Sequence, residues 1–231
     1  MSIELAPAPF LCLIPYLMKK GLISIQENLN FYFRWMANFA FVNLLWLIFS
    51  MAGLLIGGFF PATVAMLAVV RRWILGEKVP IFQRFLSEFK SNFIKSNLYG
   101  WSLTITGIIL FINYQVLIST EFNFQPWIVF CFYITLFFYV LVILNIFPVY
   151  VNFDAPWYVN IRSSLLIGVL NLHLVLGMGV LIALLIYLIF AFPVFLLFFS
   201  GSLIAYAQMW IVTHAMNKLE KRKNENILVK S

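Results

Sequence analysis

The sequence predicts an all-α polytopic membrane protein, a helical bundle with about five full transmembrane helices and additional cytoplasmic interfacial amphipathic helices. The chain has 231 residues, of which 64% are apolar and only 10% charged, against roughly 45–50% apolar and about 25% charged in soluble domains. Its mean hydropathy is +0.99, and its few charges are separated by long uncharged stretches. Water-soluble enzymes, nucleic-acid-binding domains and disordered tails need a polar exterior, so the composition excludes them and favours a lipid bilayer.

The uncharged stretches define where the chain can cross the bilayer. A spanning helix needs about 20 mostly apolar residues, and a charge at its centre is costly. The charges leave room for five spans, with Pro193 marking the junction of the last two. The predicted spans are 36–58, 98–118, 127–147, 172–190 and 193–214. We expect them to form one transmembrane domain over residues 35–217, preceded by an N-terminal extension with an interfacial segment (1–34) and followed by a basic tail (218–231).

A short helix is predicted directly after the first span. Pro61, which follows Phe60, is the first residue of the segment 61–75, and proline suits the first position of a helix. The apolar part of this segment is about ten residues long, which is too short to cross the membrane. Two placements remain open: an elbow lying in the cytoplasmic interface, or a half-helix that dips back into the membrane.

The distribution of Lys and Arg predicts the orientation, because these residues collect on the cytoplasmic side. Residues 71–95 and the C-terminal tail are strongly basic, whereas the link 119–126 carries only Glu121. We therefore expect a multi-pass membrane protein whose first link and C-terminus are cytoplasmic. The side of the N-terminus stays open, because it depends on whether residues 59–70 re-enter the membrane. Translation from Met1 or from Met18 is left open as well.

The link between the first two spans contains a stripe of phenylalanines. Phe82, Phe85, Phe89 and Phe93 recur at helical spacing, with polar residues on the opposite face. Such a basic amphipathic helix is typical of one lying in the membrane interface. The alternative is a docking surface that also engages a partner protein.

The second half of the chain repeats this order weakly. Phe147-Pro148 closes the third predicted span as Phe60-Pro61 closes the first, and a helix over residues 157–171 then leads into the fourth. Duplicated architectures occur in transporters, where binding sites form at the repeat interface. Repeated helical hairpins are also a simple way to build a bundle.

The ionisable residues do not suggest catalysis. His173 and His214 are predicted at similar depth and, with Asp154, could bind a proton or a metal, but two separate interfacial histidines are the favoured interpretation. Cys12 and Cys131 have no metal-ligand spacing and are interpreted as small buried hydrophobes. We therefore expect no catalytic residue, no metal site, no cofactor, no nucleic-acid partner and no enzymatic activity.

Polar and small residues inside the spans have two interpretations. Amides in lipid need partners, so they form interhelical hydrogen bonds worth about 0.6–2 kcal/mol each or line a pathway, and we favour the first. The intramembrane amides are Asn38, Asn43, Asn113, Asn145 and Gln208. Gly53 and Gly57 form a GxxxG motif that permits close helix approach, within the chain or to a second copy in a homo-oligomer.

Residues 43–100 carry a series of linked motifs. They are NLLW (43–46), FPAT (60–63), AVVRRW (68–73), Gly76-Glu77, Pro80-x-Phe82, and then Phe85, Phe89, Phe93 and Asn97. Their order and spacing resemble the YesL-like family of bacterial membrane proteins, a family of unknown function found with carbohydrate ABC importers. The resemblance implies a bacterial plasma membrane and a partner role in sugar uptake.

These considerations give one leading function and one alternative. The leading hypothesis is a non-catalytic accessory or regulatory partner of a carbohydrate ABC importer, contacting its permease subunits. The alternative is an independent small-molecule transporter with a polar pathway at the repeat interface. The expected partner-binding residues are Arg71, Arg72, Trp73, Glu77, Phe82, Phe85 and Phe89. The expected structural motif residues are Asn43, Trp46, Pro61, Thr63, Gly76, Pro80 and Asn97. The motif cluster can equally serve only to shape the elbow helix.

Overall fold

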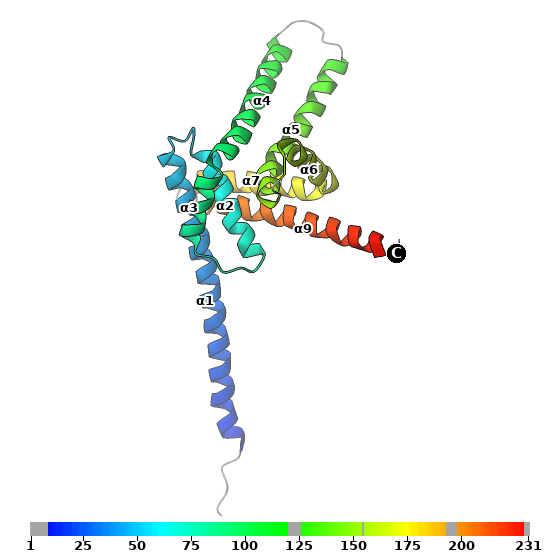
Figure 1. Cartoon of the computed structure of the whole chain (residues 1–231). Coiled ribbons are helices and arrows are strands. Elements are labelled where there is room, and N and C mark those ends of the chain that lie inside the picture. The colour runs from blue at the N-terminus through cyan, green and yellow to red at the C-terminus, as the bar shows by residue number, and fades with distance from the viewer. Residues whose placement is uncertain (1–8, 120–125, 154, 193–197, 229–231) are drawn as a thin grey trace, which may run out of the picture.

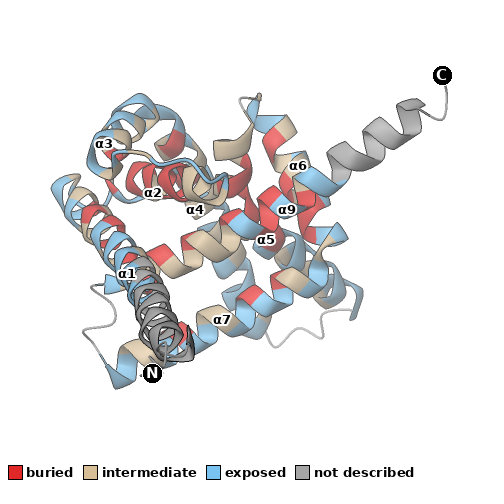
Figure 2. Ribbon diagram, turned by 90° about the horizontal axis from the view of Figure 1, so that it is seen from below, coloured by how far each residue is buried: buried red, intermediate tan, exposed pale blue. Residues whose placement is uncertain are grey.

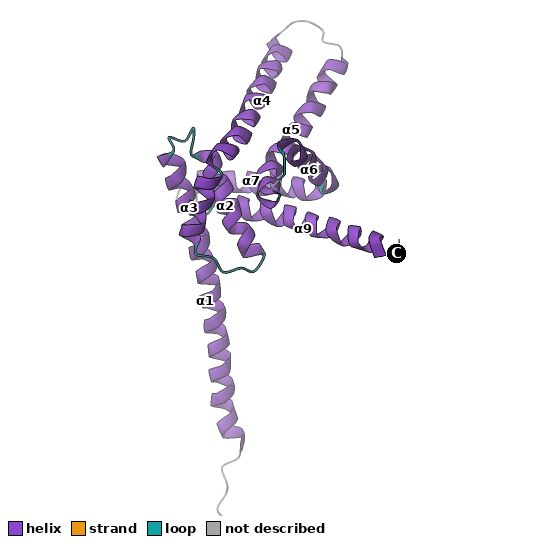
Figure 3. Ribbon diagram, in the orientation of Figure 1, coloured by secondary structure: helices purple, strands orange, loops and turns teal. Residues whose placement is uncertain are grey.

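The structure, a computed structural model, is entirely helical over the residues that it describes, namely 9–119, 126–153, 155–192 and 198–228. Figures 1 and 3 show helices joined by short loops, and no strand occurs in these ranges. The predicted all-α class is therefore confirmed. The helices are α1 (Pro9–Ala52), α2 (Phe59–Ile74), α3 (Ile81–Ser91), α4 (Phe93–Ser119), α5 (Pro126–Asn152), α6 (Trp157–Leu170), α7 (Leu172–Ala191) and α9 (Ser200–Leu228).

Four helical segments are long and apolar enough to cross a membrane. They are Tyr32–Ala52 of α1, Phe93–Ser119, Pro126–Asn152 and Leu172–Ala191, and they coincide with the first four predicted spans. The chain is therefore a polytopic membrane protein. The fifth predicted span, 193–214, begins outside the described residues and continues in α9, which is not one of the four segments. That span stays a prediction.

The first span ends earlier than predicted, and its glycines have another role. Helix α1 ends at Ala52 and the chain reverses over residues 53–58, where Leu54 and Leu55 have φ angles of 56° and 60°. A Cβ atom on Gly53 would lie 2.4 Å from the Cα atom of Gly58. The placement of the GxxxG motif on a helix surface is therefore wrong, because these glycines allow a tight backbone turn. Association of two copies there remains a prediction.

Helix α2 lies at the centre of the molecule. Pro61, Ala62 and every residue from Val64 to Val70 are buried, and Figure 2 shows α2 almost entirely in the colour of buried residues. It packs against α1, α3, α4, α5 and α9. A helix lying on a membrane surface would keep one face exposed, so the burial of α2 argues against the elbow in the interface. A half-helix that dips back into the membrane stays a prediction.

Hydrogen bonds from α1 connect α9 and α2 to the core. Asn43 is fully buried, and its Oδ1 accepts hydrogen bonds from the backbone N–H groups of Gly201 (2.9 Å) and Ser202 (3.1 Å). First-turn amides of a helix have no partner within the helix, so Asn43 satisfies two of them in α9. Trp46 Nε1 donates to Thr63 Oγ1 of α2 at 3.0 Å. The predicted interhelical role of Asn43 is confirmed.

The two Phe-Pro pairs meet in space. Helix α5 does not end at Phe147-Pro148 as predicted but continues through Pro148 to Asn152. The ring of Phe60 stacks on that of Phe147 with centroids 6.0 Å apart, and Phe60 also covers Gly100 of α4, where a Cβ atom would clash with the ring. Helix α6 matches the helix predicted over 157–171 to within one residue.

We predict that Asn43→Ala lowers the stability of the protein by about 1–2 kcal/mol, because two buried amides of α9 lose their acceptor. The midpoint of thermal unfolding in detergent measures this loss. The control is Asn113→Ala, which removes an exposed side chain that donates to the Ile109 carbonyl oxygen of its own helix; we expect a change below about 0.5 kcal/mol there. Equal midpoints for the two variants would contradict the role given to Asn43.

Candidate functional site

A basic cavity opens between α2, α3, α4 and α5. Its volume is about 390 Å³. Among the described residues that line it, four are cationic, namely Arg71, Arg72, Arg84 and Lys95, and one is a carboxylate, Glu88. The remaining lining residues are Val64, Ala68, Ser91, Asn92, Tyr150 and Val151. The cavity therefore carries an excess of positive charge and suits an anion.

The local sequence explains how the helices place these charges. Arg71 and Arg72 lie in the last turn of α2, where the helix dipole favours cations. Gly76 then adopts a φ angle of 78°, a conformation that glycine tolerates, and the chain turns back toward α3. Pro80 precedes the first residue of α3 and fixes where that helix begins. The basic end of α2 and Arg84 in the first turn of α3 thus line one cavity.

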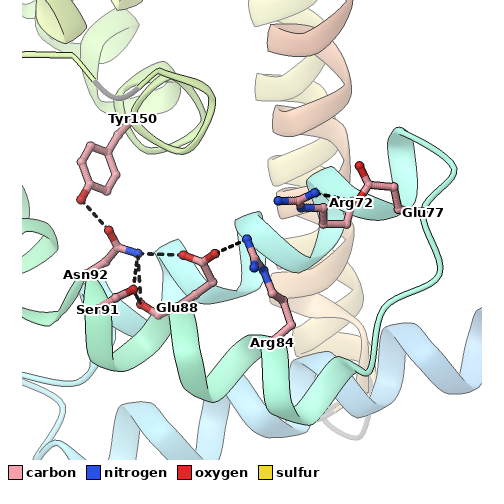
Figure 4. Close-up of polar contacts among 7 residues, drawn as sticks. All are labelled: Arg72, Glu77, Arg84, Glu88, Ser91, Asn92 and Tyr150. Carbon is pink, nitrogen blue, oxygen red and sulfur yellow. Dashed lines mark hydrogen bonds and ion pairs between the residues drawn. The ribbon is translucent and has the colours of Figure 1, made fainter.

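A polar network crosses the cavity from α3 to α5 (Figure 4). Arg84 pairs with Glu88 one turn later on α3, with Nη2 and Oε1 2.5 Å apart. The other carboxylate oxygen of Glu88 accepts a hydrogen bond from Asn92 Nδ2 at 2.8 Å. Asn92 Oδ1 in turn accepts from the hydroxyl of Tyr150 at 2.7 Å. Glu88 is therefore occupied by two neighbours and neutralises only part of the positive charge.

The two motif arginines have different partners. Arg71 Nε donates to Asn152 Oδ1 at the end of α5, at 2.7 Å. Arg72 forms an ion pair of 2.6 Å with Glu77, and both side chains are about one-third or more exposed to solvent. Glu77, one of the expected partner-binding residues, is thus paired with Arg72. Arg71 instead ties α2 to α5 and faces the cavity.

Three of the predicted partner-binding aromatic residues contact the protein's own core. Phe85 is fully buried, and Phe49 of α1 lies against both Phe85 (ring centroids 5.3 Å apart) and Phe89 (5.0 Å). Trp73 packs on the ring of Phe39, also in α1, at 5.6 Å. Phe85 therefore has no surface to offer a partner, which corrects the prediction at that position. Phe82 is 49% exposed, and its partner-binding role stays a prediction.

The predicted structural motif residues hold the helices around α2. Asn43, Trp46 and Thr63 make the contacts described above, and Pro61 is buried in the first turn of α2. Asn97 Nδ2 donates to the carbonyl oxygen of Gly57 at 2.9 Å, which ties α4 to the glycine turn. These residues position the walls of the cavity and do not line it.

Several cavity residues were missed by the sequence analysis. Arg84 and Lys95 were used only as charges that predict the orientation. Tyr150, which lines the cavity, and Asn152, which accepts a hydrogen bond from the cavity residue Arg71, were not identified. Tyr150 meets Asn92, which is 58 positions away in the chain. No local spacing could reveal such a contact, although the density of charge over residues 71–95 was a usable signal.

The other candidate residues do not form a common site. Asp154 lies outside the described residues. His173 lines a largely apolar pocket of about 370 Å³ between α7 and α9, and the ring of His214 stacks on Trp210 at 5.4 Å. Among the described residues, no group of three His, Cys, Asp or Glu side chains could hold a metal ion. Cys131 is exposed, not buried as predicted, because it lies in the first half of α5, whereas the buried residues of this helix lie between Leu141 and Val149.

Fold and site together define a polytopic helical membrane protein with a basic cavity beside a buried central helix. A family model described as "Protein of unknown function, DUF624" matches residues 39–114, which include α2, α3 and most of the cavity. The chain is 36% identical to "Uncharacterized protein YteU" of Bacillus subtilis (strain 168) over 193 residues, 83% of this chain and 86% of the relative. The chain therefore belongs to the DUF624 family of proteins of unknown function. The resemblance to the YesL-like family that the motifs indicated is confirmed.

Two further relatives come from the same organism. "Uncharacterized protein YesL" is 29% identical over 203 residues, 87% of this chain and 96% of the relative. "Uncharacterized protein YesV" is 29% identical over 191 residues, 80% of this chain and 90% of the relative. No solved structure matches the chain.

We predict that Phe85→Glu prevents stable folding, because a carboxylate replaces a fully buried ring beside Phe49, at a cost of about 3 kcal/mol or more. Phe82→Glu, on the exposed side of the same helix, serves as the control and should leave the protein folded. The yield of monodisperse protein in size-exclusion chromatography measures both. A normal yield of the Phe85 variant would show that this face is solvated.

Proposed function

We propose that this protein is a non-catalytic accessory or regulatory partner of a carbohydrate ABC importer in the bacterial plasma membrane. The resemblance to the YesL-like family supports this function, because it implies an association with such importers. The proposal also includes the orientation expected from the basic residues, with residues 71–95 and the C-terminus in the cytoplasm.

One surface carries the proposal, the α2–α3 turn surface, which consists of Leu75, Glu77, Lys78 and Phe82. Leu75 is 47% exposed and Phe82 is 49% exposed, although both lie in a segment outside the four candidate spans. Glu77 and Lys78, which lie between them in the sequence, are exposed as well. Exposed apolar side chains within a charged rim are typical of protein–protein interfaces. This surface would face permease subunits at the cytoplasmic side.

The geometry gives less support to an independent transporter. That alternative requires a polar pathway past Asn43, Asn145 and Gln208. Asn43 and Asn145 are buried, with 0% and 3% of their surfaces exposed. Both amides bind backbone groups, in α9 for Asn43 and at the Leu141 carbonyl of its own helix for Asn145. Two of the three polar residues are thus used to build the fold, which favours the accessory role.

The orientation can be tested by cysteine labelling in a background in which Cys12 and Cys131 are replaced by Ser. A cysteine at Lys90 should react with a membrane-impermeant maleimide only after permeabilisation of the cells. A cysteine at Glu121, which lies outside the described residues, should react in intact cells. Labelling at Lys90 from outside would reverse the proposed topology.

The docking role predicts a loss of partner binding without a loss of folding. In Leu75→Glu combined with Phe82→Glu, two charges replace the exposed apolar groups, and we expect copurification with the permease subunits and sugar uptake to fall at least tenfold. Lys90→Glu, an exposed change on the same segment outside the α2–α3 turn surface, is the matched control. Normal uptake and copurification of an abundant, folded double variant would contradict the proposed function.

A further inference from the structure

We propose that the basic cavity is the headgroup end of a binding site for one anionic phospholipid. The cavity adjoins a second pocket of about 370 Å³, with which it shares Lys95 and Tyr150. The second pocket shares Leu98, Tyr99 and Trp157 with a third, of about 420 Å³. The three adjoining pockets therefore mark a path along α4 that starts at the basic cavity. This inference is independent of any importer.

Among the described residues, the cationic end of the path has one carboxylate, Glu88, for four cationic side chains. Glu88 is held by Arg84 and Asn92, as described above. The Nε atom of Arg84 is buried and donates to no acceptor within the described part of the chain. Lys95 is exposed at the junction of the first two pockets. A phosphate group would supply acceptors to guanidinium and ammonium groups, and basic pockets between membrane helices bind anionic headgroups in this way.

The other end of the path is apolar and follows a membrane span. Its lining includes Leu98, Leu103 and Ile161, with three hydroxyl side chains on α4, those of Tyr99, Ser102 and Thr106. The hydroxyl of Thr106 donates to the Ser102 carbonyl oxygen of its own helix, so it does not need an acceptor from a ligand. From Lys95 to Thr106 the helix rises about 16 Å, close to the roughly 15 Å thickness of one hydrocarbon leaflet. The groove therefore has the length of an acyl chain, and a free phosphate would leave it empty.

Aromatic side chains mark the boundary between the two ends. The rings of Tyr99 and Tyr150 lie 5.1 Å apart, and the hydroxyl of Tyr99 accepts a hydrogen bond from Asn160 Nδ2 at 3.1 Å. Trp157 is 65% exposed beside them. Tyr and Trp concentrate at the headgroup level of bilayers. Charge, aromatic boundary and apolar groove thus follow one another in the order of the parts of a phospholipid.

The headgroup is tested by native mass spectrometry of the purified, delipidated full-length chain with added phosphatidylglycerol or phosphatidylcholine. We expect preferential binding of phosphatidylglycerol, and about fivefold weaker binding after Lys95→Gln, since one cation near an anionic headgroup is removed. Lys90→Gln is the matched control, because Lys90 is exposed on α3 and does not line the cavity. Equal binding of the two lipids, or equal binding by the two variants, would overturn the proposal.

The groove is tested separately. Ser102→Phe fills it from α4, and we expect at least a fivefold loss of phosphatidylglycerol binding. Ile108→Phe is the control, because Ile108 is exposed on α4 and does not line the groove. Glycerol 3-phosphate, the headgroup phosphate without acyl chains, should not displace the lipid at equal concentration. Displacement would identify a soluble phosphate ligand and overturn the proposal, as would unchanged binding by the Ser102 variant.

Discussion

The burial of α2 is the constraint on which the rest of the structure depends. This helix is too short to span a bilayer, yet its residues from Val64 to Val70 are removed from solvent by five other helices. Contacts from Trp46 and Phe60 fix its first turn against α1, α4 and α5. Because the start and the packing of α2 are fixed, Arg71 and Arg72 in its last turn lie at the basic cavity. The basic cavity is thus a consequence of how the core is assembled.

Hydropathy and charge predicted much of this architecture from the sequence. Four spans and the helix at 157–171 were located within a few residues, because long apolar runs and prolines leave clear boundaries. The depth of α2 could not be predicted, since an apolar segment ending in two arginines fits a surface helix as well as a core helix. The turn at 53–58 was missed for a similar reason: Leu54 and Leu55 carry no signature of positive φ.

The candidate site shows the same division between local and long-range information. Helical spacing predicted that Phe85 and Phe89 share a face, but it could not reveal that Phe49 of α1 covers that face. The motif arginines stood out in the sequence, whereas Tyr150 and Asn152 gained importance only through contacts with residues 58 or more positions away. Phe60 and Phe147 are an instructive exception, because a weak sequence echo corresponded to a real ring contact.

The most direct test of this account is the accessibility of α2 in native membranes. In a cysteine-free background, Ala65→Cys places a thiol at a fully buried position of α2, and Ser87→Cys places one on the exposed side of α3. A small maleimide applied to permeabilised membranes should label position 87 within minutes and position 65 only after denaturation. Equal labelling of both positions in the folded protein would show that α2 lies at the surface and would contradict the account.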